Sequence, residues 1–370
     1  MIDLLPQIVD WFAAGERIAV ATVIRVVGSA PRPVGARMIV SSGGRMAGSV
    51  SGGCVETTVY EEMMDVLDGG SPRKLHFGIT DDMIWDVGLA CGGTIDVYVQ
   101  LLEPALVQAF RDHVEQGQPV VLATVVSGGA AGDTALITPE GVVLGLAEAG
   151  IAAAAQDVLT ARVEGGAVLE LAPDAEVFIE PYFPPPVLIV VGGVHIAIPL
   201  VRFAKELGFR VVVVDPRAKF ANRDRFPEAD VILVEWPDEA LAHLDVDDAT
   251  YVVLLTHDPK IDEPTLASAL KTEAAYIGAI GSRKTHAARF ERVAKWGVTA
   301  EQLQRVHAPI GLDLGGRTPE QTALSIIAEV VAVKNGRSGA SLRSTTGPIG
   351  QRARHPAKSR AVVTADRDRP

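Results

Sequence analysis

Val187-Leu188-Ile189-Val190-Val191-Gly192-Gly193-Val194-His195-Ile196-Ala197 is the stretch that decides the fold of the second half of the chain. A continuous apolar run that ends in a glycine turn and leads into a helical pattern is typical of a central parallel strand followed by its crossover helix. Further apolar runs cover 210–214, 230–234 and 250–255, with helical patterns between them. This alternation predicts a Rossmann-like, doubly wound parallel sheet over residues 187–336.

The glycine turn and Asp215 together resemble a dinucleotide-binding fingerprint. Asp215 follows Gly192 by 23 residues, at the end of the second strand, where an acid usually binds a ribose hydroxyl. Val194 stands where the fingerprint has its second glycine, and its branched side chain would crowd a pyrophosphate. The carboxylate of Asp215 would also repel a 2′-phosphate. A nucleotide site that uses Gly192, Gly193 and Asp215 is one interpretation, with NAD(P) itself disfavoured by Val194.

Three further polar residues are expected at the carboxyl edge of this sheet. His195 lies in the glycine turn, His257 follows the strand at 250–255, and Arg283 opens another predicted helix. Open α/β sheets bind their ligands at this edge, and the N–H groups at a helix start attract anions. These residues could line one crevice, or they could be separate loop residues with no shared ligand.

The first 180 residues are expected to form a mixed α+β domain. Strands are predicted near 17–27, 38–40, 45–48, 73–78, 94–102, 119–126, 134–138, 142–146, 167–171 and 176–180, and helices near 2–14, 54–67, 105–116 and 147–161. Residues 181–186, Pro-Tyr-Phe-Pro-Pro-Pro, predict a stiff linker to the second domain. From 337 to 370, eight lysines and arginines stand against two acids among Gly, Ser and Pro, so we expect a basic, disordered tail.

Both cysteines of the chain stand beside a diglycine. Gly52-Gly53-Cys54 precedes a predicted helix, and Cys91-Gly92-Gly93 reverses the order. Glycine lets a bulky or anionic ligand approach the backbone, and a thiol at a helix start is favoured as thiolate, which binds soft metals and transfers sulfur. The alternative is a pair of small buried hydrophobes. A structural zinc site is disfavoured because two cysteines would need two further ligands.

Sequence blocks around these cysteines resemble the XdhC/CoxI family of accessory factors for molybdenum hydroxylases. The first blocks are Gly28-Ser29-Ala30-Pro31-Arg32-Pro33, residues 48–56 and Cys91-Gly92-Gly93-Thr94. The resemblance resumes at 195–199, Asp215-Pro216-Arg217, 256–259, 276–283 and 307–313. It implies a protein that binds the molybdenum cofactor, supports its sulfuration together with a cysteine desulfurase, and inserts it into a hydroxylase such as xanthine dehydrogenase or carbon monoxide dehydrogenase.

The resemblance also implies roles for single residues. Cys54 and Cys91 are the candidates to contact molybdenum or sulfur, and the sequence does not decide between them. The guanidinium groups of Arg32 and Arg37 would bind the cofactor's phosphate, unless they are solvated surface charges. The chain would be an accessory protein and not an enzyme. The rival interpretations are an NAD(P)-dependent oxidoreductase and a nucleotide-sensing binding module.

Composition narrows the setting in which the protein is expected to work. The 370-residue chain has a net charge of −12 at pH 7, which argues against generic binding to nucleic acid or to anionic membranes. No apolar run approaches the roughly 20 residues that span a bilayer, and no secretory signal pattern opens the sequence. We therefore expect a cytoplasmic protein of two domains that forms homo-oligomers.

Overall fold

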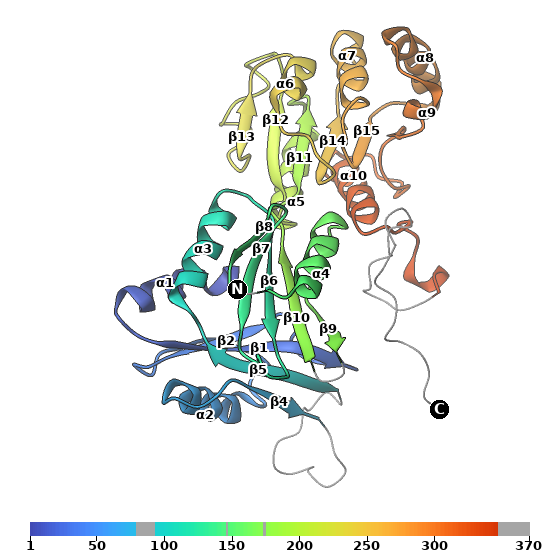
Figure 1. Cartoon of the computed structure of the whole chain (residues 1–370). Coiled ribbons are helices and arrows are strands. Elements are labelled where there is room, and N and C mark those ends of the chain that lie inside the picture. The colour runs from blue at the N-terminus through green and yellow to red at the C-terminus, as the bar shows by residue number, and fades with distance from the viewer. Residues whose placement is uncertain (79–92, 146, 173–174, 347–370) are drawn as a thin grey trace. The chain divides into compact units, whose positions relative to one another are not determined.

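A computed structural model describes residues 1–78, 93–145, 147–172 and 175–346 (Figure 1). The chain divides into two compact units, Met1–Pro184 and Pro185–Pro370, and the division falls inside the proline-rich segment at 181–186. Within the described residues, no helix has the length and apolar character that crossing a bilayer requires. Cys91, Gly92 and most of the predicted tail lie outside the described residues.

The first unit is built from two five-stranded antiparallel sheets with helices. Sheet A has the strand order β3-β2-β1-β5-β4, and sheet B has the order β8-β7-β6-β10-β9. The elements of the first half are η1 (Ile2–Leu4), α1 (Leu5–Ala13), β1 (Ile18–Val27), β2 (Arg37–Ser41), β3 (Met46–Gly48), α2 (Glu56–Leu67), β4 (Arg73–Phe77) and β5 (Thr94–Leu101). Those of the second half are α3 (Pro104–Glu115), β6 (Val120–Val125), β7 (Thr134–Thr138), β8 (Gly141–Leu144), α4 (Ala149–Thr160), β9 (Ala167–Ala172) and β10 (Ala175–Tyr182).

The two halves of this unit form a structural repeat. Each runs helix, three strands, helix, two strands, and the strand order of sheet A matches that of sheet B position by position. The registers agree as well: Thr22 of β1 pairs with Arg37 and Tyr98, and Thr124 of β6 pairs with Thr134 and Phe178. The separate elements were predicted from the sequence, whereas the repeat was not.

Helices cover one face of each sheet, and the opposite faces pack together. Helix α2 packs on sheet A through its buried apolar residues, and α4 packs on sheet B in the equivalent way. Between the sheets, Ile24 and Tyr98 of sheet A meet Val126 and Phe178 of the second half. A cavity of about 30 Å³ remains between the sheets, with a partly polar lining that includes Arg37.

The second unit is the doubly wound parallel sheet that the sequence predicted. Its strand order is β13-β12-β11-β14-β15-β16, and all neighbouring strands are parallel. The elements are β11 (Val187–Val191), α5 (Ala197–Glu206), β12 (Arg210–Val214), β13 (Val231–Leu233), α6 (Pro237–His243), β14 (Thr250–Leu254), α7 (Pro259–Ala269), β15 (Tyr276–Ala279), α8 (Arg283–Val293), η2 (Ala294–Trp296), α9 (Ala300–Leu303), β16 (Val306–His307), α10 (Pro319–Lys334) and η3 (Leu342–Ser344).

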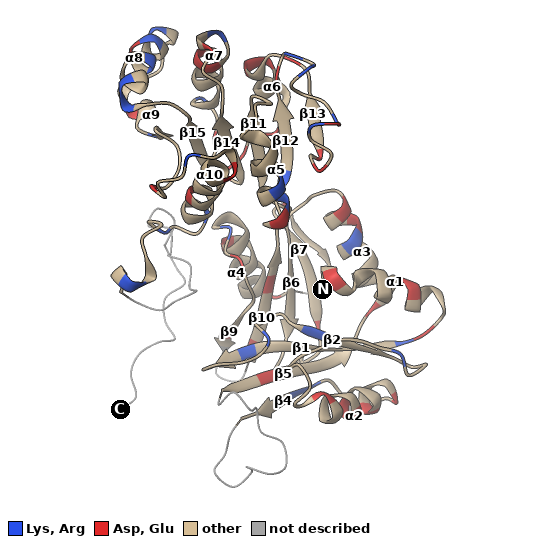
Figure 2. Cartoon of the chain, turned by 180° about the vertical axis from the view of Figure 1, so that it is seen from behind, with Lys and Arg blue, Asp and Glu red and all other residues tan. Residues whose placement is uncertain are grey.

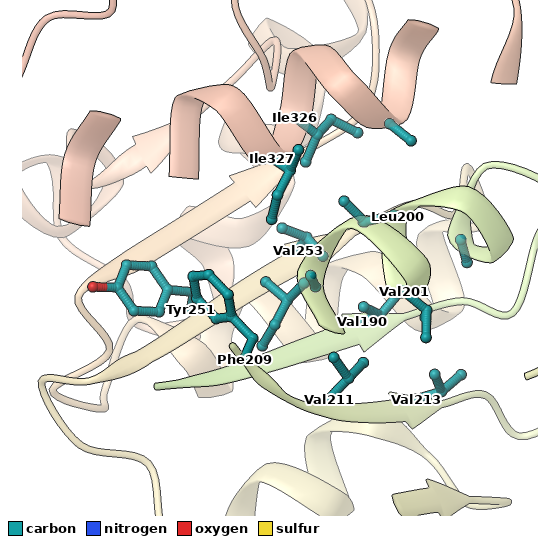
Figure 3. Packing of buried hydrophobic residues seen from close by; sticks show 14 of the residues in the cluster. Val190, Leu200, Val201, Phe209, Val211, Val213, Tyr251, Val253, Ile326 and Ile327 are labelled. Carbon is teal, nitrogen blue, oxygen red and sulfur yellow. The ribbon is translucent and has the colours of Figure 1, made fainter. Parts of the chain in front are cut away.

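Buried side chains on both faces explain why the strands of the second unit are continuous apolar runs. Val190, Val211, Val213 and Val253 alternate to one face and pack with α5 and with α10, as Figure 3 shows. The intervening strand residues face α6 and α7. Each fully buried side chain of this size contributes roughly 1.5–3 kcal/mol relative to its exposed state. This core fixes the carboxyl edge of the sheet, where the predicted ligand residues lie.

Candidate functional site

Cys54 is presented to solvent by a loop whose ends are buried. Val50, Ser51 and Val55 are buried, whereas Gly52, Gly53 and Cys54 between them are exposed. Both glycines have positive φ, at 81° and 123°, so residues with side chains would be strained there. The loop therefore holds a free thiol at its exposed tip. The alternative of a buried, inert cysteine is wrong for Cys54.

The carboxylate of Glu56 organises this loop. It accepts hydrogen bonds from the side chains of Ser49 and Ser51 and from the amides of Ser51 (2.8 Å), Gly52 (3.0 Å) and Gly53 (2.8 Å). Burial would raise the pKa of Glu56, but the hydrogen bonds from the serine side chains and the loop amides lower it to about 2. Glu56 thus remains ionised and ties the loop to the first turn of α2.

Two expectations about this loop need correction. The helix begins at Glu56, after an N-cap at Val55, and not at Cys54, so the thiol precedes the helix. Glycine was expected to let a bulky or anionic ligand approach the backbone here, yet the amides of Gly52 and Gly53 already donate to Glu56. An anion bound near Cys54 therefore needs another partner than these amides.

Three connections of the first repeat emerge at one end of sheet A. Strands β1, β3 and β4 end there, because β3 and β4 both run parallel to β1 in the antiparallel order. Gly52 lies against Pro31, since a Cβ on Gly52 would be 3.9 Å from the Cβ of Pro31. A Cβ on Gly93 would collide with the backbone oxygen of Ser29. The segment 28–31 thus contacts both the Cys54 loop and Gly93. In the sequence, Gly93 follows Cys91 by two residues.

The connections of the second repeat that correspond to the two cysteine-bearing ones are shorter and contain no cysteine. In the first repeat β3 is joined to α2 by residues 49–55, and β4 to β5 by residues 78–93; the equivalent connections are 145–148 and 173–174. Gly48 and Gly145 occupy equivalent places at the ends of β3 and β8, with φ of 78° and 81°. The framework is therefore shared, and the long connections are specific to the first repeat.

Arg37 is not available to grip a phosphate. Its side chain is 8% exposed and donates to Glu180 Oε1 at 2.7 Å, to the hydroxyl of Tyr182 at 3.0 Å and to the carbonyl of Gly35. Burial would lower the pKa of Arg37, but Glu180 and Tyr182 raise it. The prediction of a ligand role for Arg37 is wrong in this arrangement, because the guanidinium is used to join β2 to β10.

Arg32, in contrast, is exposed beside Pro31. No ion pair or hydrogen bond within the described residues engages its guanidinium. It lines an open cleft of about 300 Å³ whose other walls include Val34, Gly166 and Pro181. Within the described part of the chain, Arg32 is therefore a cation without a partner, and it follows Pro31, the residue that lies against Gly52 of the Cys54 loop.

In the second unit, Asp215 is completely buried at the end of β12. It accepts from the amide of Gly193 (2.9 Å) and from three groups of Arg217: the amide (2.9 Å), Nε (2.8 Å) and Nη2 (2.8 Å). Burial would raise the pKa of Asp215, but the Arg217 side chain and the two amides lower it. The sequence predicted a free carboxylate that binds ribose or repels phosphate. That prediction is wrong, because the carboxylate is neutralised by Arg217.

The glycine turn after β11 is a packing feature in this unit. A Cβ on Gly192 would collide with the side chain of Thr256, and one on Gly193 with the backbone oxygen of Phe220. Val194 is half-buried and packs against the core beneath α5. Its methyl groups are thus engaged by the protein, and this packing does not support the expected clash with a pyrophosphate.

His195, His257 and Arg283 lie at the carboxyl edge as predicted, and all three are exposed. Within the described residues no hydrogen bond or ion pair joins them. Ser282 caps α8 with its own hydroxyl, which accepts from the amide of Thr285. Figure 2 shows basic residues on α8, and the first two residues of this helix are Arg283 and Lys284.

Beneath His257 lies a buried polar cluster that the sequence analysis missed. Asp262 and Arg289 are 1% and 3% exposed and form an ion pair at 2.7 Å, and Thr256 donates to the same carboxylate. Arg289 also donates to the carbonyl of Ile280, so the cluster joins the connections that follow β14 and β15. Across the described ranges, no three His, Cys, Asp or Glu side chains converge on a position for a metal ion.

Glu56 and Arg217 belong to sequence blocks that carry the family resemblance, but no role was predicted for either residue. The sequence signals were present: Glu56 stands two residues after Cys54 at a helix start, where acids are favoured, and Arg217 follows Asp215 across a proline that enforces a turn. Neither signal reveals the number of hydrogen bonds that each residue makes.

Comparison with known proteins covers both units. Residues 11–78 match the model of the XdhC and CoxI family, and residues 188–330 match the model of the XdhC Rossmann domain. The chain is 26% identical to a Bacillus subtilis protein named as a probable component of xanthine dehydrogenase, over 86% of this chain and 94% of that protein. It is 27% identical to the "Molybdenum cofactor insertion chaperone PaoD" of Escherichia coli, over 88% of this chain and 86% of that one.

A solved structure gives the same result for the fold. A crystal structure described as a xanthine dehydrogenase from Bacillus halodurans superposes with a TM-score of 0.66 at 27% identity, covering 92% of this chain and 98% of that one. The family resemblance seen in the sequence blocks around the cysteines and at the carboxyl edge is thereby confirmed. The chain belongs to the XdhC/CoxI family.

Proposed function

We propose that this protein is an insertion chaperone for the molybdenum cofactor: it binds the cofactor, supports its sulfuration and delivers it to a molybdenum hydroxylase. Similarity to the Escherichia coli chaperone over most of both chains supports this function. An accessory role, and not catalysis, is part of the proposal. Its clients would be hydroxylases of the xanthine dehydrogenase or carbon monoxide dehydrogenase type, and a cysteine desulfurase would supply the sulfur.

The observation that carries the proposal is the difference between the two repeats. Both cysteine-bearing connections occur only in the first repeat, at one end of sheet A, while the equivalent connections of the second repeat are short. Exposed connections on a rigid framework are where binding residues usually lie. The Cys54 loop is also fixed by hydrogen bonds to Glu56, so its thiol is held in one place before any ligand arrives.

The residues at this end of sheet A fit the chemistry of the proposed ligand. The cofactor is a pterin that carries molybdenum on a dithiolene and ends in a phosphate, and when bound it supplies the metal centre that the client needs. Cys54 offers an exposed soft sulfur, which suits molybdenum or a transferable sulfur atom. Arg32 offers a free guanidinium for the phosphate. Cys91, two residues before Gly93 in the sequence, is the second sulfur donor of the proposal.

The experiment is retention of cofactor by protein purified from cells with an intact cofactor pathway. Molybdenum is measured by mass spectrometry and pterin by fluorescence after oxidation, for the unmodified protein and for Cys54→Ala, Cys91→Ala and Arg32→Ala. The matched control is Met46→Ala, because Met46 is 56% exposed on β3 in the same repeat. We expect the cysteine variants to lose most of the pterin, Arg32→Ala to lose part of it, and the control to keep it.

The proposal also requires transfer to a client. The loaded protein is mixed with a hydroxylase purified without cofactor, and the recovery of hydroxylase activity is followed over time. Absence of pterin from the unmodified protein, or equal retention by both cysteine variants and the control, would overturn the proposed site. Retention without any transfer would refute the insertion role.

A further inference from the structure

At the carboxyl edge of the second unit, the acid that dinucleotide-binding sheets use to bind ribose is Asp215, and Arg217 follows it by two residues and pairs with it. The strand order places β11 and β12 side by side, with β14 on the other side of β11, so the edge contains the switch point at which such sheets bind nucleotides. In that arrangement the acid after the second strand accepts from the ribose hydroxyls. Here Asp215 already accepts from Gly193 and from Arg217, and it is fully buried. A ribose diol would therefore find no free carboxylate at Asp215.

The guanidinium of Arg217 is fixed in its orientation by Asp215 and by the ring of Phe220. Nε and Nη2 bind Asp215 on one side, and the centre of its guanidinium lies 4.0 Å from the centroid of the Phe220 ring. The side chain is nevertheless 43% exposed. Nη1, on the side away from Asp215, donates to no acceptor within the described residues. A planar guanidinium fixed at one edge and open at the other is suited to bind a phosphate through two parallel hydrogen bonds.

The surroundings of Arg217 add a second cation and an apolar surface. Arg225 lies 5.7 Å from the centroid of the same Phe220 ring, and it donates to the carbonyl of Gly193 at 2.8 Å. Asp258, after β14, is the acid that faces Arg217 besides Asp215. Val234 and Trp236, which follow the neighbouring strand β13, are 52% and 44% exposed. Exposed aromatic and apolar side chains near a phosphate site offer a surface on which a base can stack.

From this geometry we propose that the edge formed by Arg217, Phe220 and Arg225 binds a nucleotide whose ribose carries a phosphate monoester, in preference to one with a free ribose diol. Arg217 is the residue that sets this specificity. The ligand class comprises 2′-phosphorylated nucleotides, such as NADPH, and 3′-phosphorylated ones, such as coenzyme A. The proposal uses residues of the second unit only and does not rest on the proposed cofactor site of the first unit.

The test is calorimetric titration of the full chain with 2′,5′-ADP, 3′,5′-ADP and 5′-ADP at low salt. The first two compounds distinguish the two sources of a ribose phosphate, and the third lacks one. We expect one of the phosphorylated compounds to bind at least about tenfold more tightly than 5′-ADP. Binding of all three with equal affinity, or no binding of either phosphorylated compound up to about 1 mM, would overturn the proposal.

Variants assign the preference to Arg217. Arg217→Ala should reduce the preference to within about twofold, and Arg217→Lys should keep only part of it because lysine cannot bind two oxygens in parallel. The control is Arg202→Ala, since Arg202 is 59% exposed on α5 of the same unit. Circular dichroism checks that each variant is folded, and the lysine variant serves if the alanine variant is not. An undiminished preference in Arg217→Lys and Arg217→Ala would assign the specificity to another group and refute this site.

Discussion

Gln100 Nε2 donates to Thr134 Oγ1 at 3.3 Å, and this pair is the repeat-related counterpart of the ion pair between Arg37 and Glu180. Thr134 begins β7 as Arg37 begins β2, and Gln100 of β5 corresponds to Glu180 of β10 by strand register. At equivalent positions of the two repeats, the unit thus has a neutral hydrogen bond, Gln100–Thr134, and an ion pair, Arg37–Glu180. The same backbone framework accepts both, which allows the contribution of the charges to be measured.

Arg37→Met should destabilise the first unit strongly. It leaves the carboxylate of Glu180 buried without its cation, and breaking a buried pair in this way costs about 3–5 kcal/mol. Urea denaturation followed by the fluorescence of buried Trp11 measures the change. Thr134→Val is the control at the equivalent position and should cost about 1 kcal/mol, because it removes only neutral hydrogen bonds, those with Gln100, Thr124 and the carbonyl of Gly132, at 3.3–3.5 Å. Similar losses for both variants would show that the ion pair contributes no more than the neutral pair.

Tyr98→Phe should leave the stability unchanged or raise it slightly. Among the described residues the hydroxyl of Tyr98 is buried without a hydrogen-bond partner, and burial raises the pKa of Tyr98 to about 12. The equivalent residue in the second repeat is Phe178, so the framework accepts a phenylalanine there. Thermal denaturation of the variant decides the matter. A loss of more than about 1 kcal/mol would mean that the hydroxyl binds a group in the cavity between the sheets, such as an ordered water.

Glu56→Gln should loosen the Cys54 loop. The amides of Gly52 and Gly53 donate to different oxygens of the Glu56 carboxylate, and glutamine has only one side-chain oxygen. At least one of these amides therefore loses its acceptor, and its hydrogen exchange should accelerate at least about tenfold. Glu61→Gln, an exposed change on the same helix, should have no effect. Unchanged exchange in Glu56→Gln would contradict the role assigned to the carboxylate.

The same carboxylate predicts how the first unit responds to acid. The pKa of Glu56 in the folded protein is about 2, below its ordinary value of 4.5. A depressed folded-state pKa means that the stabilisation is complete above about pH 4.5 and is lost as the pH falls towards 2. Melting temperatures of the unmodified protein should therefore fall more steeply across this range than those of Glu56→Gln. Parallel curves would rule out a measurable contribution from Glu56.

A protein made of residues 187–336 alone should fold. Its sheet is covered on both faces by its own helices, with two buried clusters that contain residues of this unit only. We expect a soluble product with a cooperative thermal transition. Aggregation, or a melt without cooperativity, would show that this unit needs the first one for its stability.

The sequence was sufficient for the second unit because its signals are local. Each apolar run is one buried strand, and Thr318 and Gln321 form the capping box at the start of α10 that their spacing indicates. The strands of the first unit were also found, mostly within two residues of their ends. The repeat was missed because the two halves share little beyond Ala-Thr-Val at 21–23 and 123–125.

The candidate sites were harder to predict because they depend on pairings over long distances along the chain. The partner of Arg37 is 143 residues away, and no local pattern identifies Glu180. Asp215 and Arg217 are near neighbours, but a sequence does not tell whether an arginine faces a ligand or neutralises the acid beside it. The exposure of Cys54 was foreseeable from its glycines; the role of Glu56 was not, because it requires the path of the loop backbone.

The repeated architecture of the first unit has a consequence for how this protein can change. Its second half shows what sheet A would be without its long connections, so the framework has a working version that carries neither cysteine. Substitutions of Cys54, at the exposed tip of the loop, therefore act on a position that the framework does not need for its own folding, unlike substitutions of the buried Val50, Ser51 and Val55. The ligand preference of the first repeat can therefore change through its connections while the strand framework shared by both repeats stays the same.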